Sequence, residues 1–190
     1  MIHRRNAHSR NDSSAAKLRE IFSDSHCIQC MLDFEAALGQ ALVRAGIAPA
    51  KASPAIKAKC KAHLYKIDQL LAAAAVPGNL AIPLVKELTQ KVAQTDAKAA
   101  GFVHWGATSQ DAIDTGLVLQ LRDTLDTLSG GVERLSAALR GLIQKHRSTV
   151  VAGRTWLQQA PPVTLGLKAA GWLDAVGRHR ERLLATREKV

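Results

Sequence analysis

Apolar residues recur every three or four positions along most of the chain, and this spacing limits what the chain can fold into. On an α-helix such spacing places the apolar side chains on one face, whereas a half-buried strand needs strict alternation. The first stripe is followed by Gly46 and Pro49, and it consists of Ile28, Met31, Leu32, Leu38 and Leu42. We find no convincing strand alternation, so the sequence predicts an all-α protein.

Two shorter stripes follow the first one. The second begins after Pro54 and ends at Pro77, and its members are Ile56, Cys60, Leu64, Ile67 and Leu71. The third is made of Ile82, Val85, Leu88 and Val92. We expect one helix for each stripe. Together they form an N-terminal helical domain over residues 15–111.

The rest of the chain, residues 112–190, predicts two long helices joined by an extended connection. The first has a stripe of Ile113, Leu117, Leu121, Leu125 and Leu128, continued by Val132, Leu135, Leu139 and Leu142. The paired glycines at 130–131 predict a bend or a break, because each glycine costs about 1 kcal/mol relative to alanine inside a helix. Residues 149–160 lack a helical stripe and are expected to be extended, with the prolines at 161–162 starting the last helix.

Two long helices cannot bury their apolar faces against each other alone. We therefore expect residues 112–190 to be the first part of a helical bundle that is incomplete in this chain. Residues 1–14 lack apolar periodicity and are rich in Arg, Asn, His and Ser. They predict a flexible basic tail.

The charge balance points to an anionic partner. The chain has 26 Lys and Arg against 16 Asp and Glu, a formal net charge of +10. We do not expect nucleic-acid binding, because aromatic residues make up 4% of the chain and no RNP, zinc-finger or P-loop pattern occurs. No apolar run approaches the roughly 18 residues of a membrane span, and the N-terminus has no apolar signal-peptide region. A soluble, cytoplasmic protein that contacts no membrane is expected.

The three cysteines predict core packing rather than a metal or redox site. Cys27 and Cys30 form a C-x-x-C pair and Cys60 stands alone. A zinc site needs a second ligand pair, and a redox motif needs a neighbouring βαβ pattern. Neither pattern is present, so we expect small apolar core residues, with no metal and no cofactor.

Residues 103–115, VHWGATSQDAIDT, join a glycine-containing loop to the start of a long helix. Thr108 and Asp111 approximate a capping box. A helix start attracts carboxylates or phosphates, and the hydroxyls of Thr108 and Ser109 are further donors. His104 can point into the same space and transfer a proton to an anion or bind it. The alternative is an ordinary capped helix with no ligand and a structural histidine.

Residues 153–166, GRTWLQQAPPVTLG, mix polar and aromatic side chains on the extended connection. In a fully extended segment the side chains alternate between two sides. One side would carry Arg154, Trp156 and Gln158, and the other Thr155, Leu157 and Gln159. The alternative is a buried linker whose Gln and Thr side chains satisfy backbone groups.

The two segments together resemble the first two signature regions of the fumarase/aspartase superfamily. Within it they are most similar to the branch that lactonises 3-carboxy-cis,cis-muconate in protocatechuate degradation, the β-ketoadipate pathway. The resemblance covers essentially the whole chain after the tail, and its other segments are LREIFSDSHCIQCMLDFEAALGQALVRAGI, GNLAIPLVKEL and RHRERL. Trp156 favours this branch, because relatives that eliminate across C–N or C–O bonds typically carry histidine there. Indole cannot exchange protons near neutral pH.

The resemblance implies a cycloisomerase that forms γ-carboxymuconolactone by adding one substrate carboxylate across a double bond. The resulting carbanion is then protonated. Negative charge accumulates on a tricarboxylate substrate, so preorganised donors should provide most of the stabilisation. Catalytic roles are implied for His104 and Ser109. Substrate-binding roles are implied for Thr108, Arg154, Thr155, Trp156 and Gln158.

The resemblance also implies a homotetramer whose active sites are shared among subunits. The third signature of the family, GSS-x-MP-x-K-x-N, supplies the serine usually regarded as the base, and this chain lacks it. Family members continue for more than as long again. We therefore expect an N-terminal fragment that is inactive alone and that a complementary C-terminal fragment could complete.

Two alternatives stay open. One is an adenylosuccinate lyase-like enzyme of the same superfamily, which predicts tight binding of a nucleotide monophosphate. The other is a catalytically dead remnant or a basic helical interaction module. Steeply salt-dependent DNA binding would favour the module.

Overall fold

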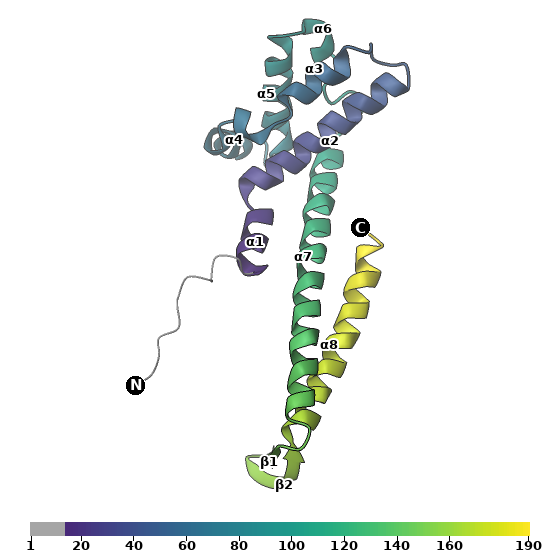
Figure 1. Cartoon of the computed structure of the whole chain (residues 1–190). Helices are drawn as coiled ribbons and strands as arrows, with labels where there is room; N and C mark the ends of the chain where they lie inside the picture. The colour runs from purple at the N-terminus through teal and green to yellow at the C-terminus, as the bar shows by residue number, and fades with distance from the viewer. Residues whose placement is uncertain (1–13) are drawn as a thin grey trace, which may run out of the picture. The chain divides into compact units, whose positions relative to one another are not determined.

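A computed structural model of the protein describes residues 14–190, so the expected basic tail lies outside the described residues except for Ser14. The chain divides into two compact units (Figure 1). One comprises residues 15–121, beyond the boundary expected at residue 111, and the other comprises residues 122–190 with Ser14. The long helix α7, Ser109–Lys145, supplies residues to both. No helix among residues 14–190 is both long and apolar enough to cross a membrane.

The unit of residues 15–121 is entirely helical. Its elements before α7 are α1 (Ser14–Ile21), α2 (Asp24–Arg44), α3 (Ala52–Lys59), the 3-10 helix η2 (Ala62–Leu64), α4 (Ile67–Ala74), α5 (Ala81–Ala93) and α6 (Ala97–Ala100). Helix α3 packs against α2, α5 and α6, and α4 packs against α5 (Figure 1).

The apolar stripes of α2 and α5 form the core of this unit. The largest buried apolar side chains are Ile28, Leu32, Ile56, Leu84, Leu88 and Val92. Burying one such side chain contributes about 1.5–3 kcal/mol. The helix expected to precede Gly46 is confirmed, and Gly46 has the positive φ of 73° that suits a residue after a helix end.

The prediction of a single helix between Pro54 and Pro77 is wrong. The chain forms three short pieces there, because the path turns at Cys60, whose ψ is 60°. The side chain of Gln29 on α2 satisfies the interrupted backbone. Its Nε2 donates to the Cys60 carbonyl at 3.3 Å, and its Oε1 accepts from the N–H of Ala62 at 2.8 Å. A contact with another helix therefore overrides the local periodicity.

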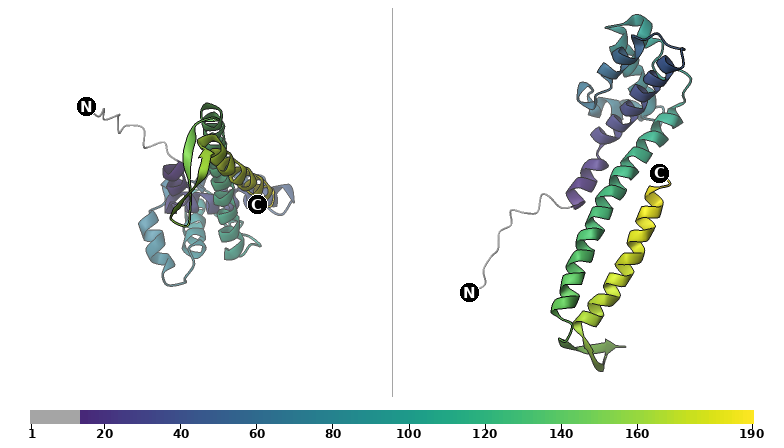
Figure 2. Two further views of the ribbon diagram at one scale, coloured as in Figure 1. Left: turned by 90° about the horizontal axis from the view of Figure 1, so that it is seen from below. Right: turned by 45° about the vertical axis from the view of Figure 1, so that its right-hand side comes forward.

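The unit of residues 122–190 consists of the second part of α7, a two-stranded hairpin and α8 (Leu165–Arg187). Figure 2 shows α8 returning beside this part of α7 from the hairpin. Arg187 forms two hydrogen bonds to the Asp126 carboxylate, at 2.8 and 3.2 Å, and Arg180 pairs with Glu133. Both ion pairs are accessible to solvent, which screens them, so they add little to stability.

Two expectations for this unit need correction. The helix is not broken at 130–131, where α7 continues without interruption. The prolines at 161–162 do not start α8; they lie in the second strand, and the helix begins at Leu165 with Thr164 as its N-cap. The helical class is confirmed, but with one small sheet that the sequence pattern did not predict.

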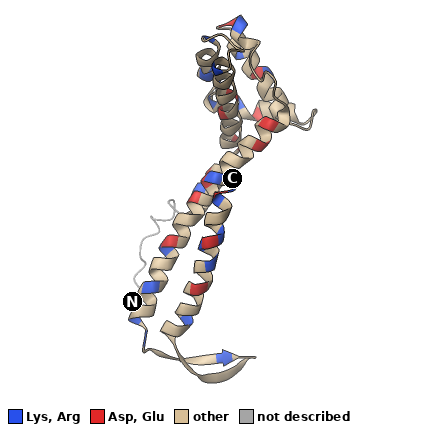
Figure 3. Ribbon diagram, turned by 90° about the vertical axis from the view of Figure 1, so that its right-hand side faces the viewer, with Lys and Arg blue, Asp and Glu red and all other residues tan. Residues whose placement is uncertain are grey.

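The α7–α8 pair leaves apolar side chains exposed, as expected for two helices that are only part of a bundle. The exposed members within this unit are Leu128, Leu135, Leu167, Trp172 and Leu184. Figure 3 shows Lys, Arg, Asp and Glu distributed along both helices.

Candidate functional site

Helix α2 anchors the loop before α7 through one buried carboxylate. Glu35 is 1% exposed, and both of its oxygens contact His104. Oε2 accepts the backbone N–H of His104 at 3.1 Å, and Oε1 lies 2.6 Å from Nδ1 of the ring. Burial raises the pKa of Glu35, while the contacts with His104 oppose this effect. The histidine that the sequence singled out is thus held in a defined position.

The backbone of this loop is unusual at two positions. His104 has a φ of 55°, in the left-handed region that residues with a side chain rarely adopt. Gly106 has a φ of 75°, and an added Cβ there would meet open space. Gly106 is therefore required by its conformation rather than by close approach of a neighbouring group.

The capping box at the start of α7 is confirmed. The Asp111 carboxylate accepts from the Thr108 N–H at 2.7 Å and from the Thr108 hydroxyl at 3.0 Å. These bonds from the Thr108 backbone and side chain lower the pKa of Asp111. The Thr108 hydroxyl has one proton to donate, and it donates that proton to Asp111. It can donate to the carboxylate of a ligand only if the bond to Asp111 breaks. Ser109, the first residue of α7, is half-buried.

The second segment forms an antiparallel hairpin of β1 (Val150–Thr155) and β2 (Gln158–Thr164). Thr155 pairs with Gln158 and Arg154 pairs with Gln159. Paired residues project from the same face of a sheet. The expectation that Arg154 and Gln158 share a side is therefore wrong, because the chain reverses between them; Thr155 and Gln158 share a face instead.

Trp156 and Leu157 form the hairpin tip, and both have positive φ, 46° and 61°. A two-residue turn of this kind ordinarily uses Asn-Gly or Asp-Gly. Trp156 is 91% exposed and Leu157 is fully exposed. The only charged residue of the hairpin is Arg154 (Figure 3). The tip therefore presents an exposed indole in a costly backbone conformation, without acidic neighbours on either strand.

The seven predicted site residues fall into two groups. His104, Thr108 and Ser109 lie in the unit of residues 15–121, at the loop and at the start of α7. Arg154, Thr155, Trp156 and Gln158 lie exposed on the hairpin of the other unit. Their convergence on one substrate stays a prediction.

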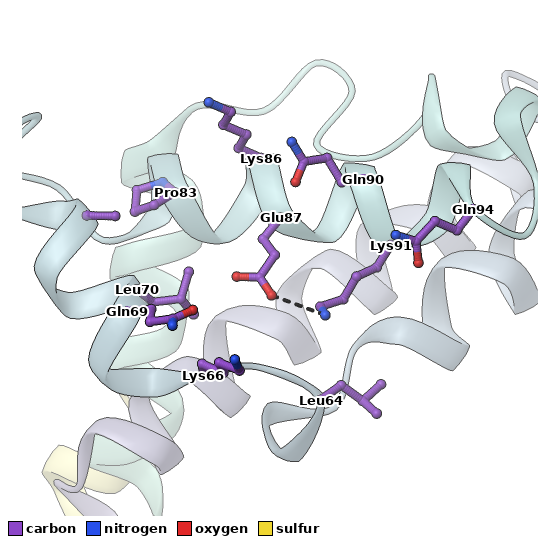
Figure 4. A pocket seen from close by; sticks show the side chains of 11 residues that line it. Leu64, Lys66, Gln69, Leu70, Pro83, Lys86, Glu87, Gln90, Lys91 and Gln94 are labelled. Carbon is purple, nitrogen blue, oxygen red and sulfur yellow. Dashed lines mark ion pairs between the residues drawn. The ribbon is translucent and has the colours of Figure 1, made fainter.

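A groove of about 510 Å³ lies between α4 and α5, and it includes none of the predicted residues (Figure 4). Its charged lining residues are Lys66, Lys86, Lys91 and Glu87, and Lys91 pairs with Glu87 at 3.1 Å. No group of three His, Cys, Asp or Glu side chains among the described residues could hold a metal ion.

The cysteines lie in or beside the core, as the sequence indicated. Cys30 and Cys60 are buried, Cys27 is partly buried, and none of the three forms a disulfide within the described residues. Burial, with nearby Glu35 and Asp33, raises the pKa of Cys60 to about 12. The Cys60 thiol is therefore protonated at neutral pH.

Sequence reasoning missed Glu35 and Gln29. Glu35 follows Leu32 by three positions and precedes Leu42 by seven, so it lies within the apolar stripe of α2. A charged residue inside an apolar stripe is a signal for a buried, partnered group, and it could have indicated Glu35. Gln29 carries no such signal.

The chain is similar in sequence to several known proteins. The model of a lyase family matches residues 9–190. The 3-carboxy-cis,cis-muconate cycloisomerase of Pseudomonas aeruginosa is 52% identical over 93% of this chain, which corresponds to 38% of that enzyme. The adenylosuccinate lyase of Pyrococcus horikoshii is 33% identical over 92% of the chain and 38% of the relative.

A solved structure is similar as well. The crystal structure of 3-carboxy-cis,cis-muconate lactonizing enzyme from Pseudomonas putida matches with a TM-score of 0.90 and 49% identity, over 94% of this chain and 42% of that one. The chain thus spans about two fifths of the length of the relatives that it matches.

Proposed function

Because the chain belongs to the lyase family of the fumarase/aspartase superfamily, we propose that it forms part of a cycloisomerase that lactonises 3-carboxy-cis,cis-muconate. The observation that carries the proposal is the 52% identity to such an enzyme over 93% of the chain, a span that includes both signature segments. A homotetramer and a cytoplasmic location stay predictions that accompany it.

The loop and the hairpin would have different roles in binding and converting the substrate. In the loop, His104 and Ser109 would act at the reacting end, and Thr108 would bind one carboxylate. On the hairpin, Thr155 and Gln158 share a face and would orient the substrate together. Trp156 would form a pocket wall, and Arg154 would supply positive charge. A reaction that adds negative charge to a tricarboxylate gains most from such fixed donors.

A chimera tests the proposal. Residues 15–190 would replace the corresponding segment of the Pseudomonas aeruginosa cycloisomerase, and lactone formation from 3-carboxy-cis,cis-muconate would be measured. We expect turnover, with Ser109→Ala lowering kcat by about 100-fold or more, as loss of a preorganised donor does. Ser25→Ala, an exposed serine on α2, is the matched control and should leave kcat unchanged. A correctly assembled chimera without turnover would refute the proposal.

Two further measurements separate the alternatives. The 190-residue chain alone is expected to form no lactone, and clear turnover would show that expectation to be wrong. Adenylosuccinate offered to the same chimera tests the adenylosuccinate lyase-like alternative. We expect no cleavage, because indole at position 156 cannot transfer a proton near neutral pH.

A further inference from the structure

Glu35 is a buried carboxylate that contacts a residue far away in the sequence, His104. It lies on the apolar stripe of α2, where an ionised group loses its hydration. Both of its oxygens contact His104, one through the backbone and one through the ring. A carboxylate that only stabilised the core would be a poor choice at this position, since an apolar side chain of similar size avoids the desolvation penalty.

His104 itself occupies a position that costs energy. Its φ of 55° suits glycine, and two residues later the loop does use glycine, at Gly106, for a φ of 75°. Strained backbone at a residue with a side chain is concentrated at functional sites, where surrounding contacts maintain it. The bond from the His104 N–H to Glu35 Oε2 is such a contact. The loop therefore has a histidine at a position whose backbone conformation favours glycine.

The geometry also defines which ring nitrogen is free. An ionised carboxylate only accepts hydrogen bonds. One oxygen of Glu35 takes the backbone N–H, so the other, 2.6 Å from Nδ1, requires a proton on Nδ1. A neutral His104 ring then has an unprotonated Nε2. A protonated Glu35 would instead donate to Nδ1 and leave the ring proton on Nε2.

We infer that Glu35 is the positioning residue for His104: it holds the strained backbone and fixes the Nδ1–H tautomer, so that Nε2 is the atom offered to a ligand. Nε2 can then accept a proton and, once protonated, donate a hydrogen bond to a carboxylate. That the ligand is 3-carboxy-cis,cis-muconate rests on the proposed function. The tautomer and its dependence on Glu35 do not.

Long-range ¹H–¹⁵N NMR spectra of the 190-residue chain read the tautomer directly, with His104 assigned by its loss in His104→Gln. We expect the neutral ring to carry its proton on Nδ1. A proton on Nε2 in the unaltered protein overturns the inference, and this result requires no folded variant of Glu35.

Glu35→Gln provides the second measurement. The Gln oxygen can keep the backbone N–H of His104, so its NH₂ group must donate to Nδ1, and the ring proton should move to Nε2. Glu87→Gln removes a carboxylate that pairs with Lys91 on α5 and is the matched control, with no change expected at His104. A folded Glu35→Gln protein with an unchanged tautomer contradicts the inference.

The chimera separates this inference from the proposed function. In an active chimera, Glu35→Gln should lower kcat by about 10-fold or more, as expected when a general acid or base is lost from its productive tautomer. Unchanged kcat would contradict a role in the reaction. A chimera that is inactive before substitution refutes the proposed function, whereas the NMR result still decides the pairing of Glu35 with His104.

Discussion

Replacing the hairpin tip with Asn-Gly should stabilise the hairpin. Trp156 and Leu157 both have positive φ, and a residue with a side chain pays about 1–2 kcal/mol for that conformation. Asn tolerates it and Gly adopts it freely, although Gly gives back about 0.5–1 kcal/mol through the greater freedom of the unfolded chain. Little burial is lost, because the Trp156 side chain is 91% exposed. The net expected gain for Trp156→Asn with Leu157→Gly is about 1–3 kcal/mol.

Amide hydrogen exchange within the hairpin measures this gain locally. At 1.4 kcal/mol per tenfold, protection of the cross-strand amides should rise by about 5- to 150-fold. Val76→Asn is the control, since Val76 is 94% exposed but does not have a positive φ; it should leave hairpin protection unchanged. Unchanged or reduced protection in the Asn-Gly variant would refute the strain argument. The same variant should lower lactone formation in the chimera, because it removes the proposed pocket wall.

Three other predictions concern packing and pH. Gly166→Ala should destabilise the unit of residues 122–190 by about 1–3 kcal/mol in urea denaturation, because the added Cβ would lie 2.9 Å from the His146 carbonyl oxygen. Gly171→Ala is the control: the added Cβ would meet open space, so this variant should be neutral or stabilising. Leu32→Ala, fully buried in the other unit, should cost about 2–5 kcal/mol, and a Tm shift within the range of surface variants would contradict that placement. The pKa of Asp111 lies below its ordinary value of 3.8. The contribution of Asp111 to stability is therefore complete above that pH and is lost as the pH falls through the lowered value. Asp111→Asn should flatten this acid limb in a plot of Tm against pH, and an unaltered limb would show that the Thr108 contacts do not stabilise the fold.

Local patterns predicted the elements whose structure is set locally. The stripe from Ile28 to Leu42 lies in α2, the one from Ile82 to Val92 lies in α5, and Thr108 with Asp111 forms the expected cap. Periodicity failed where a distant side chain replaces the helical hydrogen bonds, as Gln29 does beside Cys60. Such a contact has no signature in the neighbouring residues.

The hairpin escaped prediction for two physical reasons. Its turn residues, Trp156 and Leu157, are not the small or polar residues that ordinarily adopt positive φ. The prolines at 161–162 argue against a strand, yet they are tolerated because the pairing register shifts opposite them, between Val151 and Gly153. The candidate residues of the site could be identified by resemblance, whereas the partner of His104 required the structure.

The place of Gln29 requires an amide and not a carboxylate. Its amide nitrogen donates to Asp33 at 2.8 Å and to the Cys60 carbonyl, while its oxygen accepts from Ala62. Hydrolysis of this amide to Glu would replace the donor with an acceptor and bring a second negative charge against Asp33. The interruption between α3 and η2 would then lose a hydrogen bond and α2 would gain a repulsion, so one change from amide to carboxylate would loosen the segment that Gln29 holds.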